Sequence, residues 1–171
     1  MNNNLIITIS RQYGTGGREI GRKLALHLGI PFYDRELITR AAKKTGFDEK
    51  LFDQLDKRAT NSFLYSLTMF GSVGLNGMSL TDQLYLAQSN IIREMAEDSS
   101  CVIVGRCADH VLRDFPNKFD FFIHGSIEDR VKRIQTCGDY EIEGKTPESA
   151  LEKMDKQRST YYNYYTGKVW G

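Results

Sequence analysis

The features that constrain the fold of this chain most are a short apolar run and the glycine-rich segment that follows it. Residues 5–9 are mostly isoleucine, and residues 10–17 contain three glycines. A run this short and β-branched is typical of a strand rather than a helix. From Arg18 onward, apolar residues recur every four positions, and Gly29 followed by Pro31 predicts the end of a helix. The sequence therefore predicts a strand, a glycine loop and a helix, in that order.

This unit suits phosphate binding, because a loop entering a helix directs backbone N–H groups and the helix dipole at one spot. Glycine removes the Cβ atom where the backbone approaches an anion or adopts a positive φ. The alternative interpretation is an ordinary helix start whose arginines are solvated, since a glycine loop alone is a weak motif. The predicted phosphate-binding residues are Gly14, Thr15, Gly16, Gly17, Arg18 and Glu19.

Farther along the chain, apolar runs alternate with segments that have helical periodicity. Strands are predicted at residues 32–33, 101–104 and 119–123. Helices are predicted at residues 35–44, 81–98 with Thr81 and Asp82 as the cap, 126–136 and about 148–158. This alternation predicts an α/β fold in which helices cover both faces of a parallel sheet.

Length and composition indicate a single domain over residues 1–171, since 40% hydrophobic and 26% charged residues are ordinary for one globular unit. The uncharged stretch at 59–81 is interpreted as a mobile insert, and the polar segment at 137–147 as a second mobile region. No further strand follows the last predicted helix. We therefore expect a C-terminal strand to be missing from this sequence and the native protein to be slightly longer.

The charge balance and the cysteines exclude several classes of protein. A net charge of +1 is too small for a protein that binds nucleic acid or an anionic membrane through bulk electrostatics. The three cysteines show no C-x-x-C spacing, so neither a zinc site nor a disulfide framework is predicted. The chain start lacks the pattern of a secretion signal, and no apolar run is long enough to span a membrane. We expect a cytoplasmic protein.

Four motifs in order resemble the cytidylate kinase-like family: SRQYGTGGREIG, GIPFYDREL, VIVGRCAD and DKQRSTYYNYYTGKVWG. The resemblance covers essentially all 171 residues. It implies a three-layer α/β/α P-loop fold with an ATP site on the glycine loop, a nucleoside monophosphate site near the second and third strands, and a closing lid at about residues 134–160. The implied activity is phosphoryl transfer from ATP to a nucleoside monophosphate, with CMP or dCMP as the leading acceptor.

The glycine loop departs from the usual phosphate-loop pattern G-x-x-x-x-G-K-[ST]. Gly17 stands where that pattern has its lysine, and Arg18 stands at the hydroxyl that binds Mg²⁺. Sliding the alignment by one residue puts Arg18 on the lysine and Glu19 on the hydroxyl. Arg18 is therefore the predicted cation for the β- and γ-phosphates. Because Val104 replaces an expected carboxylate, Mg²⁺ is expected to be held mainly by nucleotide phosphates and water.

Four residues match the family's positions around the acceptor. Asp34 and Arg40 follow the second predicted strand, where an arginine fork suits a phosphate and Asp34 could instead cap its helix. Arg106 follows the third strand, at the edge where open α/β sheets bind ligands. Asp109 belongs to the same motif, with helix capping as its alternative role.

In the lid, the resemblance assigns Arg133 and Arg158 to the phosphoryl group in flight and Asp155 to the orientation of an arginine. The tyrosines at 161–165 are expected to pack against the sheet or a partner subunit rather than to stack on bases.

Two other functions stay open. The missing lysine could mean a nucleotide-binding or sensing module without turnover, and a kinase of another small acceptor would keep the same loop.

Overall fold

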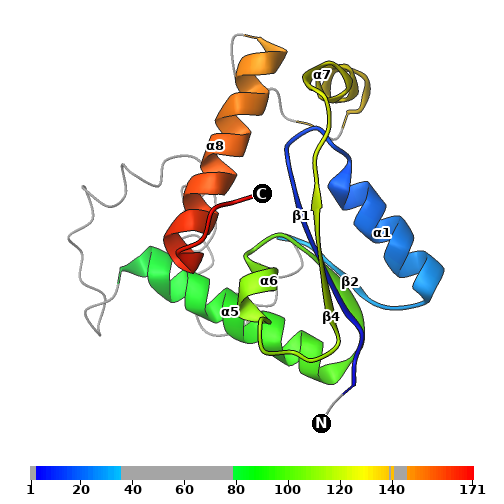
Figure 1. The fold of residues 1–171 in the computed structure, drawn as a ribbon, viewed down its shortest axis with the longest axis vertical. Helices are drawn as coiled ribbons and strands as arrows, with labels where there is room; N and C mark the ends of the chain where they lie inside the picture. Colours follow the sequence, from blue (N-terminus) through cyan, green and yellow to red (C-terminus); the bar gives the residue numbers. More distant parts are fainter. Residues whose placement is uncertain (1–2, 36–78, 139, 141–145) are drawn as a thin grey trace.

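The structure, a computed structural model, describes residues 3–35, 79–138, 140 and 146–171. Four strands form one parallel sheet in the order β2-β3-β1-β4 (Figure 1). Their bounds are Ile6–Arg11 for β1, Phe32–Tyr33 for β2, Cys101–Val104 for β3 and Lys118–Ile123 for β4. The predicted parallel α/β sheet is confirmed.

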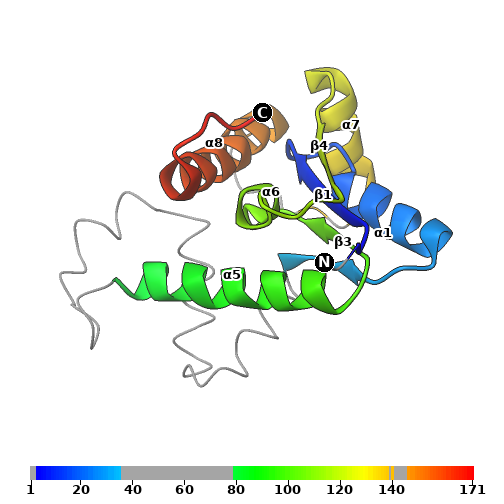
Figure 2. The ribbon, with the colours of Figure 1, turned by 60° about the horizontal axis from the view of Figure 1, so that its bottom comes forward.

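Helices cover both faces of the sheet, which makes three layers (Figure 2). Helix α1, Gly17–Leu28, packs against Ile7 and Ile9 of β1. On the other face, α5, Leu80–Asp98, and α6, Ala108–Val111, pack against Ile6 and against Ile103 of β3. This division follows from the strand geometry, because successive side chains of a strand point to opposite faces.

Glycines set both ends of α1. Gly16 is the N-cap residue with φ of +75°, and Gly29 is the C-cap residue with φ of +64°. The Gly29 amide donates to carbonyl oxygens of the last helical turn, as in the common glycine-terminated helix end. The predicted helix and its end at Gly29 are confirmed.

Helix α5 begins before its expected cap. Ser79, and not Thr81 or Asp82, is the N-cap residue, and its Oγ accepts a 3.1 Å hydrogen bond from the Asp82 amide. Serine is a strong N-cap residue because its short side chain reaches the amide three residues ahead. The sequence-based choice was therefore wrong by one half-turn, because several residues with capping side chains stand side by side here.

Helices α7, Ile127–Thr136, and α8, Pro147–Thr166, lie beyond the end of β1 (Figure 1). Helix α8 runs well past its expected end near Arg158, through the tyrosine-rich segment. The tyrosines extend it because they gain a surface to pack on: the ring of Tyr165 stacks on Tyr85 of α5, with 3.9 Å between centroids. The tyrosines were expected to pack against the sheet or a partner subunit, but Tyr165 packs against helix α5 instead.

Some predictions lie outside the described residues. The first is residues 59–78 of the predicted mobile insert. The second is the predicted 35–44 helix after Arg35, which includes Arg40. The third is residues 139 and 141–145 of the predicted mobile region at 137–147. Among the helices that the structure describes, no stretch is long and apolar enough to cross a membrane.

Candidate functional site

The glycine loop joins the end of β1 to the start of α1 as predicted. Gly14 and Gly16 have φ of +80° and +75°, a region that favours glycine. Two hydrogen bonds shape the loop: the Gln12 amide donates to the Ile123 carbonyl at 2.9 Å, and Thr15 Oγ1 donates to the Gln12 carbonyl at 2.9 Å. The amides of the first turn of α1, which begins at Gly17 directly after this loop, have no intrahelical acceptors.

The two helices that follow the sheet hold the loop in place. Asp155 of α8 accepts a 2.7 Å hydrogen bond from the Tyr13 amide, and Arg130 of α7 donates a 2.7 Å hydrogen bond from Nε to the Tyr13 carbonyl. Arg130 and Asp155 also form an ion pair whose side chains are 7% and 18% exposed. Asp155 thus contacts an arginine, as the resemblance implied, and that arginine is the buried Arg130.

The guanidinium of Arg133 lies directly over the loop at the start of α1. A Cβ atom added at Gly16 would lie 2.7 Å from Cζ of Arg133. Arg133 forms an ion pair with Glu19, and its Nε donates to the Tyr140 hydroxyl at 3.2 Å. That hydrogen bond is the main reason why the pKa of Arg133 is raised. Two predicted residues, Arg133 and Glu19, are therefore brought together at the loop.

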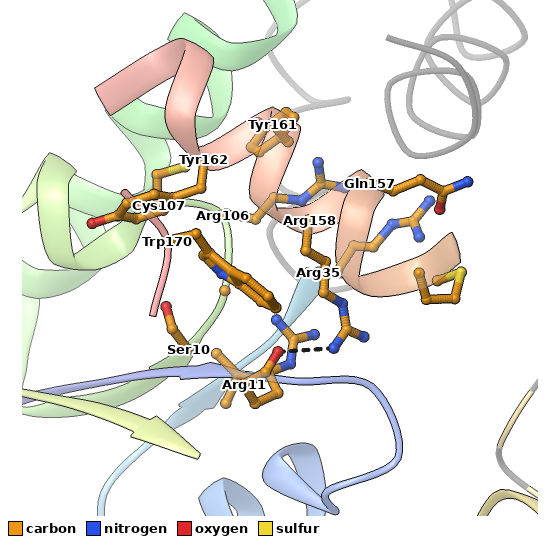
Figure 3. Close-up of a pocket in the computed structure, with 13 residues that line it drawn as sticks. Ser10, Arg11, Arg35, Arg106, Cys107, Gln157, Arg158, Tyr161, Tyr162 and Trp170 are labelled. Atoms are coloured by element: carbon orange, nitrogen blue, oxygen red, sulfur yellow. Dashed lines mark hydrogen bonds between the residues drawn. The ribbon is translucent and has the colours of Figure 1, made fainter. Parts of the chain in front are cut away.

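A pocket opens at the carboxyl ends of β1 and β3, between the sheet and α8 (Figure 3). Four of its lining side chains are arginines: Arg11 ends β1, Arg35 is the second residue after β2, Arg106 lies in the turn after β3, and Arg158 belongs to α8. The lining residues are Ser10, Arg11, Arg35, Val104, Gly105, Arg106, Cys107, Met154, Gln157, Arg158, Tyr161, Tyr162 and Trp170. This edge is where open parallel sheets bind ligands.

Arg106 occupies a strained turn at the rim of this pocket. Gly105, Arg106 and Cys107 have successive φ values of +83°, +56° and +54°. The left-handed region costs a residue with a Cβ atom roughly 1–2 kcal/mol. Such strain persists where the surrounding structure imposes it, often at ligand sites. The turn places the Arg106 guanidinium 5.8 Å from the ring centroid of Tyr161, in the pocket that the sequence predicted for it.

Arg158 enters the same pocket from α8. Its Nη1 donates a 3.0 Å hydrogen bond to the carbonyl of Arg11 (Figure 3). Its guanidinium lies 5.2 Å from the ring centroid of Tyr13. Burial lowers the pKa of Arg158. The lid arginine expected from the resemblance is therefore in contact with both the strand end and the loop.

Arg11 and Arg35 are pocket residues that the sequence reasoning did not assign. The pKa of Arg11 is lowered well below its usual value by burial and by the charges of Arg158, Arg106 and Arg35. A signal for Arg11 was present, because it is the charged residue that directly ends an apolar strand. No comparable pattern singled out Arg35.

Arg18 and Asp34, which were assigned to different ligands, contact one another. Arg18 Nε donates a 2.7 Å hydrogen bond to Asp34 Oδ2, with the Arg18 side chain 46% exposed and that of Asp34 6% exposed. Neither residue is among those that line the pocket. Their roles toward ATP and acceptor remain predictions.

Asp109, which was predicted to bind the phosphate acceptor, contacts the wall of the pocket rather than lining it. Asp109 Oδ2 accepts a 2.6 Å hydrogen bond from the Tyr162 hydroxyl, so it orients a residue of the pocket wall.

Val104 is buried at the end of β3, where a metal-binding carboxylate was expected. In the part of the chain that the structure describes, no group of three or more His, Cys, Asp or Glu residues could hold a metal ion.

Residues 6–171 match the cytidylate kinase-like family. A solved structure that resembles the chain is an uncharacterized protein from Eubacterium ventriosum ATCC 27560, with 30% identity and a TM-score of 0.68 over 98% of this chain and 81% of that one. No curated protein matches the chain.

Two kinases of known structure share the fold at lower identity. A gluconokinase from Sinorhizobium meliloti 1021 has 16% identity and a TM-score of 0.52 over 92% of this chain and 76% of its own. A shikimate kinase from Bacteroides thetaiotaomicron has 16% identity and a TM-score of 0.53 over 93% of this chain and 82% of its own. The three-layer α/β/α kinase fold is thereby confirmed.

Proposed function

The chain belongs to the cytidylate kinase-like family, and on that basis we propose that it transfers the γ-phosphoryl group of ATP to a nucleoside monophosphate. The observation that carries the proposal is the convergence of four arginines on one pocket beside the glycine loop. Like charges that line one cavity repel one another, and a bound anion offsets that repulsion. Guanidinium groups pair well with phosphate oxygens, which they contact through parallel hydrogen bonds.

ATP would bind along the glycine loop. The amides from Gly14 to Glu19 are positioned to cradle its phosphates, because the loop leads into the N-terminus of α1. Arg133 lies over Gly16 and would neutralise the transferring group once a phosphate replaces Glu19 as its partner. Helices α7 and α8, which carry Arg133 and Arg158, would act as the lid.

The acceptor would bind in the arginine-lined pocket, with its phosphate on Arg106 and Arg158. Arg40 is proposed as a third contact from the family resemblance, and Asp34 as a group for the ribose or base. A phosphate oxygen of the acceptor attacks the γ-phosphorus, and the bond to the β-phosphate oxygen breaks to release ADP. That nucleophile is already charged, so no side-chain base is required.

The residues at the site fit a polyphosphate better than a bare metal ion. Glu19 supplies a carboxylate in the first turn of α1, where it pairs with Lys23 and Arg133. Magnesium bound with the nucleotide supplies charge neutralisation of the phosphates and keeps several waters. We propose that this chain holds it mainly through the nucleotide.

The test is a coupled assay that measures ADP release from ATP and Mg²⁺ with CMP, dCMP, UMP, AMP and GMP as separate acceptors. We expect the highest kcat/KM with CMP or dCMP. Arg106→Ala should lower it by roughly 10²-fold, the scale seen when one charge-stabilising donor is removed. Arg113→Ala is the matched control, because Arg113 is an exposed arginine outside the pocket.

Two results would contradict the proposal. Tight ATP binding with no turnover of any acceptor would favour a nucleotide-binding or sensing module. Turnover of shikimate or gluconate, but of no monophosphate, would favour a kinase of a hydroxylated acid, since arginine pairs with a carboxylate as well as with a phosphate.

A further inference from the structure

Arg11 is directed into the site by the alternation of β1. Ile7 and Ile9 point toward α1, and Arg11 follows them at the next position on the same face. Its stem therefore meets the first residue of α1. A Cβ atom added at Gly17 would lie 2.8 Å from both Cβ and Cγ of Arg11.

This contact involves the position where a phosphate loop ordinarily has its lysine. A side chain at residue 17 and the stem of Arg11 cannot both occupy the space above the start of α1. The lack of a lysine at position 17 and the course of the Arg11 side chain therefore depend on each other. Glycine at 17 is what allows an arginine from the preceding strand to cross the loop.

A second glycine receives the other end of the side chain. Arg11 Nη1 would lie 2.5 Å from a Cβ atom added at Gly105, the residue that follows β3. Gly105 also has φ of +83°, which disfavours other residues. Two glycines from distant segments thus leave a passage for Arg11, and its guanidinium ends in the pocket (Figure 3).

The Arg11 guanidinium has cationic neighbours and, among the residues that the structure describes, no hydrogen-bond acceptor. Within the part of the chain that the structure describes, it donates no hydrogen bond, whereas Arg158 Nη1 bonds to the Arg11 backbone carbonyl. The charges of Arg158, Arg106 and Arg35 oppose it, and the charge of Asp34 attracts it. A charge withdrawn from water is costly without a partner, and a phosphate group would supply both charge and acceptors.

We propose that Arg11 supplies the cation that phosphate-loop kinases take from the lysine at the end of the loop, and that its guanidinium binds the β- and γ-phosphates of ATP. This inference rests on the proposed function. It competes with the sequence-based assignment of the same role to Arg18, whose Nε donates to Asp34 and whose side chain is half exposed. The Arg11 stem crosses the start of α1 at Gly17 and its guanidinium lines the acceptor pocket, so it lies between the proposed ATP and acceptor sites, whereas Arg18 does not line the pocket.

The test is an exchange of the two positions. We would compare Arg11→Gly, Gly17→Lys and the double variant with wild type, measuring ATP affinity by calorimetry and kcat in the coupled assay. Arg11→Gly should lower kcat by roughly 10²-fold, the effect of losing one charge-stabilising donor. Gly17→Lys should also lose activity, because its side chain meets the Arg11 stem. The double variant should recover at least about tenfold over Arg11→Gly, since it restores a loop lysine in the vacated space.

Two further variants separate a binding role from a structural one. Arg11→Met keeps most of the stem without the charge and should weaken ATP binding by about tenfold or more. Arg11→Lys keeps the charge without the fork and should retain part of the affinity. Arg18→Ala is expected to weaken ATP binding less than Arg11→Met does. Thermal melts of each variant confirm that it is folded.

The outcomes distinguish the two proposals. A wild type that neither binds ATP nor transfers phosphate overturns the proposed function. If the wild type is active and the Arg11→Met variant binds ATP as tightly as the Arg113→Ala control, only the role proposed for Arg11 is overturned. A double variant no better than Arg11→Gly would likewise show that Arg11 is not exchangeable with a loop lysine.

Discussion

The backbone amide of Tyr13 donates a hydrogen bond of 2.7 Å to the carboxylate of Asp155, a residue 142 positions later. This bond fixes the glycine loop to α8, and the same carboxylate pairs with Arg130 of α7. The conformation of the loop therefore depends on two helices that the sequence places far from it.

Replacing Asp155 should destabilise the protein. Asp155→Ala leaves the Arg130 guanidinium buried without its ion-pair partner, and we expect the free energy of unfolding to fall by about 3 kcal/mol. Asp155→Asn keeps an acceptor for the Tyr13 amide and should lose less. Urea unfolding followed by circular dichroism measures both. Asp114→Ala is the control, because its pair with Arg113 is exposed and should contribute less than about 1 kcal/mol. Equal losses at 114 and 155 would contradict the prediction.

Gly16→Ala should cost more stability than Gly29→Ala. Both glycines have positive φ, so each substitution carries a backbone cost of roughly 1–2 kcal/mol. At Gly29 nothing lies within 4 Å of an added Cβ, whereas at Gly16 that atom meets the Arg133 guanidinium. The difference between the two variants in thermal unfolding isolates the contact with Arg133. Because the end of the Arg133 side chain can shift, the extra loss at Gly16 is the loss of its contacts with Glu19 and Tyr140, and equal losses at both glycines would show that those contacts contribute nothing to stability.

His110 should make stability depend on pH. Its pKa is lowered by burial and then by the charges of Arg113, Lys168 and Arg93, against the opposing charge of Asp109. Because the folded pKa lies below the unfolded value, the unfolded chain binds the proton more readily as pH falls. The free energy of unfolding should therefore be highest above the pKa of histidine in the unfolded chain, about 6.5, and should fall as the pH is lowered below that value.

His110→Gln should reduce the difference between urea midpoints measured at pH 5 and pH 7.5. His27→Gln serves as a control for the substitution itself, since His27 is exposed on α1. A His110→Gln variant with the full wild-type difference would assign the pH dependence to other groups.

Thiol modification should distinguish the three cysteines. Cys101 and Cys107 are buried, and burial raises their pKa to about 11 and about 12, respectively, whereas Cys137 is partly exposed. The thiolate is the reactive form, so at pH 8 the two buried thiols hold about one part in a thousand or less of it. Ellman's reagent should modify one thiol per native chain and all three in denaturant. Cys137→Ser should remove the fast reaction, and a fast phase that persists would show that a buried thiol is accessible.

Local signals in the sequence were sufficient for the fold. The isoleucine run, the glycine loop and Gly29 mark where β1 ends and α1 starts and stops, because strand periodicity and positive φ are properties of neighbouring residues. The alternation of strands and helices then implied the parallel sheet. The extension of α8 to Thr166 could not be predicted this way, since it depends on the contact of its tyrosines with α5.

The position of Arg106 also followed from sequence alone, because the turn after a buried parallel strand lies at the ligand edge of the sheet. Which arginine of the loop enters the pocket was decided only by the tertiary structure. Arg18 stands at the start of α1 but pairs with Asp34, while Arg11 passes over Gly17 toward Gly105. A side chain's direction depends on the groups that leave room for it and the charges that attract it, and here those come from segments far apart in the chain.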